Sequence, residues 1–208
     1  MKRTIFSLTL FTVFFAAHAQ LKLGLKFAPV ISSNRVEIDS ETYDVDKIQS
    51  SVKFSLGLIA DKSFSDSYYF STGLLIMPKV VGFSLIDEAG MINTEKYNLQ
   101  YLHIPVSLKL FTNELRPDLN IFFQIGGALE LKLDDKASDD DYDAINNFTP
   151  VDAVAMIGAG AEYKIGINTV IFTDFIYQQG LVNVVQSNLH PTLEIRNTIF
   201  AIEFGIKF

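Results

Sequence analysis

Cysteine is absent from all 208 residues of the chain. Soluble secreted domains of this size often carry disulfides, so the absence weighs slightly against that class. Helical periodicity and glycine-rich phosphate loops are also missing, which leaves strands as the predicted secondary structure. Hydrophobic residues make up 49% and charged residues 20% of the chain, a balance that excludes a disordered protein.

Long apolar runs are absent apart from one at the N-terminus. Residues 1–19 read as a cleaved signal peptide, with basic Lys2 and Arg3, an apolar stretch from Ile5 to Phe15, and small residues before Gln20. The apolar stretch is shorter than the roughly 20 residues that a membrane-spanning helix needs. We therefore expect residues 20–208 to form the mature domain, without a lipid anchor, because no cysteine follows the cleavage site.

Positive charge is scarce in the predicted mature chain. Without Lys2 and Arg3, 15 basic residues remain against 24 acidic ones. Nucleic-acid binding requires a basic footprint, so nucleic acid is excluded as a partner.

Period-two alternation of apolar and polar residues is the dominant pattern. It is clearest at 197–208, where Phe200, Phe204 and Phe208 share one face, and Glu203 and Lys207 share the other. Such alternation predicts strands with one apolar and one polar face. Eight segments carry it, at about 21–30, 52–61, 68–79, 97–111, 119–133, 151–165, 169–180 and 197–208.

The connections between these strands alternate in length. The connections at 62–67, 112–118 and 166–168 are short, whereas four others are long and polar: 31–51, 80–96, 134–150 and 181–196. Long loops at one end and short turns at the other are typical of transmembrane barrels. We therefore predict an all-β fold, an eight-stranded antiparallel up-and-down transmembrane β-barrel.

Alternation alone also fits a soluble, lipocalin-like barrel that binds a small apolar ligand. The composition of the polar face favours the membrane barrel, because a narrow interior suits small residues and paired charges. Seven glycines lie on this face: Gly24, Gly57, Gly73, Gly126, Gly158, Gly160 and Gly205. The predicted lumen charges are Lys22, Lys26, Lys53, Lys79, Lys109, Lys132, Lys164 and Lys207 with Asp61, Glu130, Asp152, Glu162, Asp174 and Glu203.

Features of the strand ends also favour a membrane barrel. Strands of about 10–12 residues match the length that crosses a bilayer at a tilt. Tyrosines near the predicted strand ends suit aromatic girdles: Tyr68, Tyr69, Tyr97, Tyr101, Tyr163 and Tyr177. The terminal Phe208 resembles the C-terminal signal that the barrel-assembly machinery recognises, so this machinery is an expected partner, together with outer-membrane lipid.

Several short segments resemble the PorT-like, porin-family outer-membrane β-barrels of Gram-negative bacteria. They are Leu21–Phe27, Tyr101–Phe111, Gly126-Gly127, Gly158-x-Gly160 with Glu162-Tyr163, Asp174–Asn183 and the closing FGIKF. The resemblance implies the barrel fold and the cell outer membrane, but no shared chemistry. Family members often carry a basic residue where this chain has Ile176, which leaves Asp174 without that lumen partner.

A catalytic reading starts from His103 and Ser107, which share the polar face of one strand with carboxylates opposite. These residue types form a Ser-His-acid set in lipid-modifying barrels, a weaker alternative. A nucleophile inside a filled lumen cannot reach lipid, so we predict lumen packing and no enzyme activity, with no catalytic residue, cofactor or resident metal.

The segment Asp134–Asp143 holds six aspartates. Asp139, Asp141 and Asp143 have the spacing of the first calcium ligands of an EF-hand, but the glycine and the distal glutamate of that loop are missing. We expect a solvated acidic loop, with weak divalent-cation contact as the alternative.

Pro78 and Pro105 interrupt predicted strands. Because a closed barrel has no edge strands, each proline is expected to mark a bulge or a missing ladder bond. The functional expectation is an outer-membrane scaffold with a narrow, filled lumen that acts through its extracellular loops, whose partner the sequence does not identify.

Overall fold

The computed structural model describes residues 21–38, 44–47, 50–86, 92–137, 145–188 and 193–208. The predicted signal peptide, 1–19, lies outside these ranges and stays a prediction. Within the described ranges, no helix is long and apolar enough to cross a membrane.

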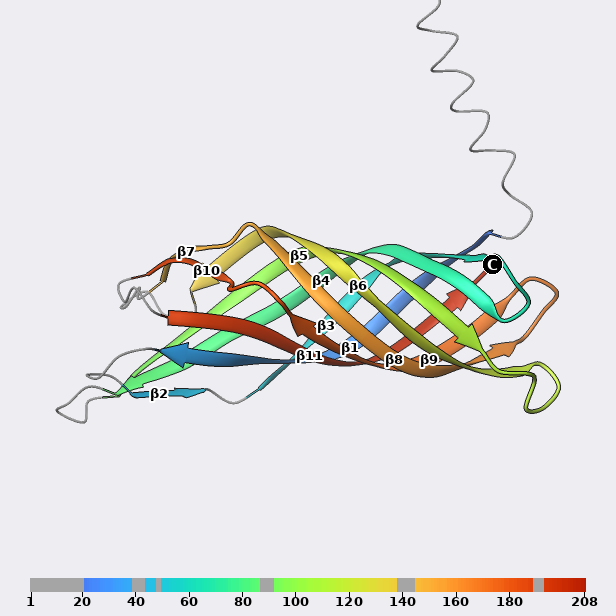
Figure 1. The fold of residues 1–208 in the computed structure, drawn as a ribbon, viewed down its shortest axis with the longest axis horizontal. Helices are drawn as coiled ribbons and strands as arrows, with labels where there is room; N and C mark the ends of the chain where they lie inside the picture. The colour runs from blue at the N-terminus through green and yellow to red at the C-terminus, as the bar shows by residue number, and fades with distance from the viewer. Residues whose placement is uncertain (1–20, 39–43, 48–49, 87–91, 138–144, 189–192) are drawn as a thin grey trace, which may run out of the picture.

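Eight long antiparallel strands form a closed barrel, as predicted (Figure 1). Each pairs with its neighbour along the chain, and the first strand pairs with the last. The strands are β1 (Leu21–Ile38), β3 (Ser51–Ser63), β4 (Tyr68–Ile86), β5 (Ile92–Phe111), β6 (Leu119–Ala137), β8 (Val151–Lys164), β9 (Val170–Gly180) and β11 (Leu193–Lys207).

The strands extend further at the long-loop end of the barrel than the alternation predicted. The strand predicted to end at Lys79 continues to Ile86, and the next begins at Ile92 rather than Tyr97. Three short strands also lie at this end: β2 (Asp44–Lys47) pairs with β4, while β7 (Ile145–Phe148) and β10 (Val185–Asn188) form a separate two-stranded sheet. The predicted loops at 31–51, 80–96, 134–150 and 181–196 are therefore partly strand.

The two faces of the wall are the ones predicted for a membrane barrel. Leucine, isoleucine and phenylalanine side chains point outward, with Phe54 and Phe175 more than 60% exposed. The predicted carboxylates point inward and are at most 6% exposed. Of the eight predicted lumen lysines, four are buried, namely Lys26, Lys79, Lys109 and Lys207. The other four lie nearer the barrel rims and keep contact with solvent: Lys22, Lys53, Lys132 and Lys164.

Glycines make room for large side chains inside the narrow barrel. A Cβ atom at Gly205 would collide with the ring of Phe172, and one at Gly160 would collide with the ring of Phe122 and with Asp174. Both rings are buried in the lumen. Lumen packing is thus the role of these glycines, as predicted.

Both prolines lie where a ladder is interrupted, as predicted. The β4–β5 register leaves out the position opposite Pro105, whose carbonyl accepts a hydrogen bond from Thr72 at 2.8 Å. Pro78 lies just past Ile76, where the β3–β4 ladder ends. Its missing N–H therefore costs no ladder bond on that side.

Beyond Ile76, β1 takes the place of β3 beside β4. The Ser32 hydroxyl accepts a hydrogen bond from the backbone N–H of Val80 at 3.0 Å. The Asn34 side chain donates to the carbonyl of Gly82 at 3.0 Å and accepts from its N–H at 3.4 Å. Side chains thus close the wall where the backbone ladder stops.

Candidate functional site: the charged lumen and its apolar seal

Asp61 is the centre of an ion-pair network near the short-turn end of the lumen. Its carboxylate accepts hydrogen bonds from Lys109 at 3.0 Å, Lys207 at 2.8 Å and Ser71 at 2.5 Å. Lys207 also pairs with Glu162. These groups come from five strands, so their contacts cross the lumen and fill it.

A second group of charges lies around Glu203 and Asp174, which are partners in the β9–β11 ladder. Lys26 donates to Glu203 at 2.7 Å. Asp174 accepts from the side-chain amide of Gln124 at 2.7 Å. A neutral amide therefore bonds Asp174, and Ile176, two residues further along β9, is buried on the same face.

A third group lies nearer the long-loop end and is centred on Lys79. Its ammonium pairs with Glu130, lies 3.2 Å from Asp152, and stands 5.0 Å from the centre of the Tyr101 ring. Glu130 also bonds His103 Nδ1 at 2.8 Å. Buried charges are stable only when paired in this way, because desolvation of a single ion costs several kcal/mol.

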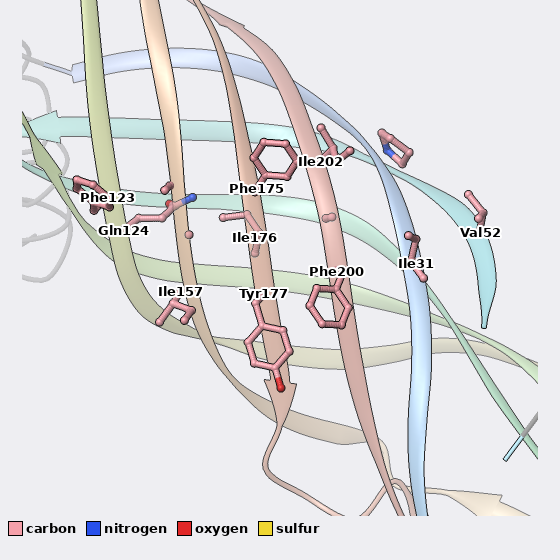
Figure 2. A pocket seen from close by; sticks show the side chains of 14 residues that line it. Ile31, Val52, Phe123, Gln124, Ile157, Phe175, Ile176, Tyr177, Phe200 and Ile202 are labelled. Carbon is pink, nitrogen blue, oxygen red and sulfur yellow. The ribbon is translucent and has the colours of Figure 1, made fainter. Parts of the chain in front are cut away.

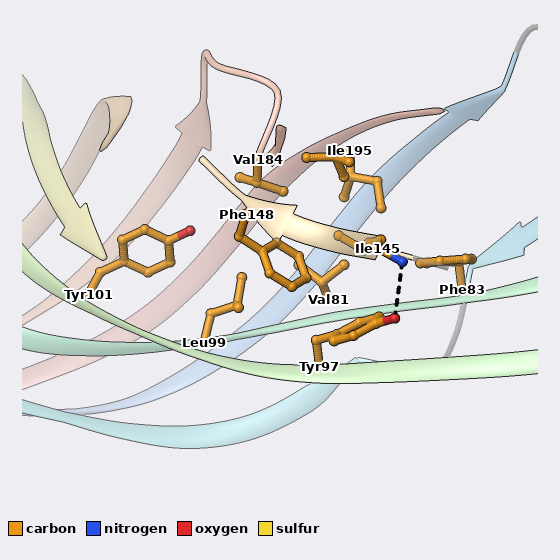
Figure 3. Close-up of a cluster of buried hydrophobic side chains, with 10 residues drawn as sticks. Val81, Phe83, Tyr97, Leu99, Tyr101, Ile145, Phe148, Val184 and Ile195 are labelled. Carbon is orange, nitrogen blue, oxygen red and sulfur yellow. Dashed lines mark hydrogen bonds between the residues drawn. The ribbon is translucent and has the colours of Figure 1, made fainter. Parts of the chain in front are cut away.

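An apolar cluster, here called the apolar seal, covers the lumen above Lys79 (Figure 3). Its residues come from the long-loop halves of β4, β5 and β11, from β7 and β10, and from Val184, which immediately precedes β10. They are Val81, Phe83, Tyr97, Leu99, Tyr101, Ile145, Phe148, Val184, Val185 and Ile195. All are at most 7% exposed.

Hydrogen bonds fix the β7–β10 segments onto the wall. The Tyr97 hydroxyl accepts a hydrogen bond from the N–H of Ile145 at 3.3 Å (Figure 3). The Tyr97 ring packs edge-on against the Phe148 ring, with 5.1 Å between the ring centres. The N–H of Val184 donates to the carbonyl of Ile195 at 2.9 Å. The segments that form the seal are therefore hydrogen-bonded to the barrel wall and packed against it.

Sequence reasoning missed the seal, because it assigned these segments to polar loops. The signal was present in the isolated apolar residues of those loops, Ile145, Phe148 and the Val184-Val185 pair. Their partners lie in other loops and strands, and alternation within one strand carries no information about such contacts.

The candidate catalytic pair is not assembled. His103 bonds Glu130, but Ser107 lies four residues away along β5, and its hydroxyl donates to Gln124 at 3.5 Å. Both side chains are at most 4% exposed. The described contacts thus link His103 to a carboxylate without a nucleophile.

The acidic segment is described only in part. Asp134 and Asp135 pair with Lys136 at 3.1 Å and Lys132 at 3.0 Å. Asp139, Asp141 and Asp143 lie outside the described residues, so the calcium alternative is not tested. Among described residues, no cluster of three or more His, Cys, Asp or Glu side chains is arranged to hold a metal ion.

Comparison with known proteins gives the same architecture. A family model described as outer membrane protein beta-barrel domain matches residues 15–186. The crystal structure of the outer membrane protein OprG from Pseudomonas aeruginosa is 13% identical, with a TM-score of 0.57, over 91% of this chain and 96% of that chain. Neisserial surface protein A is 11% identical, with a TM-score of 0.51, over 90% and 97%. No curated protein matches the sequence.

The matching family and the direction of the side chains agree on the environment of the barrel. A soluble barrel that binds an apolar ligand would need its apolar face inside. Here the apolar face is outside and the charges are inside, so the soluble alternative is wrong. The barrel spans the outer membrane, with the short turns periplasmic and the long-loop end extracellular.

Proposed function

The chain belongs to the outer membrane protein beta-barrel domain family, and from that premise we propose that it is a closed scaffold that acts through its extracellular end. The observation that carries this proposal is the doubly blocked lumen. Ion pairs cross it around Asp61 and Lys79, Lys26 pairs with Glu203 of the adjacent strand, and the apolar seal covers them. Solutes have no path through such an interior, which leaves the extracellular surface for function.

Planar-bilayer recording of the purified barrel tests this proposal. We expect no large, stable conductance, because opening a path would require breaking buried ion pairs and lifting the seal. A sustained conductance step in the native protein would contradict the closed scaffold. A barrel of known conductance in the same membrane serves as the positive control.

We also propose membership of the PorT-like, porin-family group, and no catalytic activity. The segments Leu21–Phe27 and Tyr101–Phe111 support the first assignment. Enclosure of His103 in the lumen and the separate bonding of Ser107 support the second. Lipid A isolated from cells with and without the protein tests for activity, since a lipid-modifying enzyme would change its acylation pattern.

We propose the barrel-assembly machinery as a partner that recognises Phe208. The Phe208 side chain is 59% exposed at the end of the chain, while its N–H donates to the carbonyl of Leu23 at 2.8 Å. Its ring is therefore accessible and its backbone is already used by the wall.

Substitution Phe208→Ala separates recognition from stability. We expect severalfold less heat-modifiable barrel in outer membranes, with unchanged refolding of purified protein in detergent. Phe204→Ala, a change of the same type within the apolar belt, is the control. Equal loss in cells and in detergent would assign Phe208 a purely structural role.

A further inference from the structure

Two arginines face each other on the outer surface of the barrel. Arg35 of β1 and Arg196 of β11 are direct partners in the ladder, and both are exposed. Like charges directly opposite each other destabilise a sheet. Arg196 has a neighbouring carboxylate, Glu194, at 3.2 Å, whereas no ion pair of Arg35 is found among the described residues.

The height of this pair matches the headgroups of the outer leaflet. On the same two strands, the exposed apolar pair nearest the extracellular end is Ile31 and Phe200. The arginines lie four residues further out, which is about 13 Å along the strand and about 10 Å in height at a typical barrel tilt. Phosphate groups of membrane lipids lie in this interfacial zone.

The nearest acidic residues of these two strands come further from the membrane than the arginines. The register places Glu37 opposite Glu194, two residues further out than Arg35 and Arg196. The cations are thus the charges nearest to the lipid surface on these strands. This order of residues along the membrane normal favours a lipid anion at the level of the arginines, below the positions of Glu37 and Glu194.

An open apolar groove of about 890 Å³ lies on the membrane side of the arginines and begins at Ile31 and Phe200, four residues away from them along the strands. Figure 2 shows the side chains that line it. Ile31, Phe200 and Tyr177 line the groove. Phe175 and Ile202, the next outward pair of β9 and β11, line it further from the arginines. Its volume is within the range of about 300–1,000 Å³ that is typical of small-molecule sites. Two outward positions between the large side chains carry small residues, Pro29 and Ala159.

We propose that this face binds one phosphorylated lipid of the outer leaflet, with an acyl chain in the groove and a phosphate between Arg35 and Arg196. The surroundings of the groove are acyl chains, so its occupant is an acyl chain. Guanidinium groups bind phosphate through two parallel hydrogen bonds. An anion between the arginines also removes their mutual repulsion.

Native mass spectrometry of the full barrel, released from micelles that contain diphosphoryl lipid A, tests the site. The variant R35Q/R196Q removes the cations, and A159L fills the groove without changing the charge. We expect each variant to bind lipid A about tenfold more weakly. In R35Q/R196Q this is the loss of one or two charge-assisted hydrogen bonds, and in A159L it is the exclusion of the acyl chain from the groove. Heat-modifiability of each variant verifies that the barrel has formed.

The matched control is K62Q/R116Q, which removes the same charge from exposed positions at the short-turn end. It should retain lipid A like the native protein. Equal retention by R35Q/R196Q and the native barrel would overturn the proposal. Displacement by inorganic phosphate at the same concentration would instead assign the arginines to free phosphate, and a mass of two barrels would assign the groove to a second copy.

Discussion

The two ends of the lumen are closed by different means. At the short-turn end, a polar cleft of about 260 Å³ opens between Lys22, Asp66, Glu114 and Lys164, and ion pairs close the lumen beneath it. At the long-loop end, the apolar seal excludes water. Wall residues alone close the first end, whereas the second also needs segments from two loops, β7 and β10.

The difference shows that charge and apolar packing are complementary ways of filling one barrel. Buried ion pairs hold the lumen only while every partner is present, since a lone charge is costly. Apolar packing loses the transfer free energy of the atoms removed plus a cost for the cavity that remains, without leaving a charge unpaired. The two ends should therefore respond differently to single substitutions.

The largest effect is expected at the charged end. Asp61→Ala leaves Lys109 without its carboxylate and Lys207 with one of two, so the free energy of unfolding should fall by about 3–5 kcal/mol. Urea unfolding of the refolded barrel in detergent measures this. Glu114→Ala, at the same end but exposed, should change it by less than about 0.5 kcal/mol. Equal effects would show that the lumen network adds no stability.

A smaller and more local effect is expected in the seal. Phe148→Ala removes a buried ring that packs against Tyr97, at a cost of about 3 kcal/mol. Because β7 and β10 form their own sheet, hydrogen exchange should quicken at the amides of Thr149 and Val184 while the wall amides keep their protection. Phe123→Ala, on the outer face, is the control. Loss of protection throughout the wall would show that seal and wall unfold as one unit.

The smallest effect is expected for an exposed ion pair. Lys136→Gln breaks a contact with Asp134, where both side chains are at least half exposed. Such pairs contribute about 0–1 kcal/mol, so the urea midpoint should not move measurably. The same change at Lys79, which is 1% exposed, should lower it strongly. A large effect at Lys136 would contradict the distinction drawn between rim and lumen charges.

The sequence predicted the strand order and the direction of side chains, because both depend on local alternation. Glu203 points inward and Phe204 outward for the same reason that any neighbouring strand residues point to opposite faces. Depth in the lumen was harder to predict. Lys22 and Lys164 follow the inward pattern, yet strand position and tilt leave them at the rim.

The apolar seal was beyond prediction from alternation. Ile145 and Val184 come from different loops and meet only because the barrel brings those loops over one opening. The outward Arg35 and Arg196 were likewise invisible as a pair until the first and last strands were placed in register. Contacts between residues distant in sequence carry no local pattern.

Pairing between β1 and β11 has a consequence for the time course of folding. Lys26 of β1 pairs with Glu203 of β11, which lies 177 residues later in the chain. Lys207 of β11 pairs with Asp61 of β3, which lies 146 residues earlier. Contacts of such high contact order form late and slowly. Until the last strand arrives, the earlier strands hold an incomplete set of counter-ions. Docking of β11 is thus the folding step that gives the buried charges their remaining counter-ions. A chain truncated before β11 should therefore remain a folding intermediate.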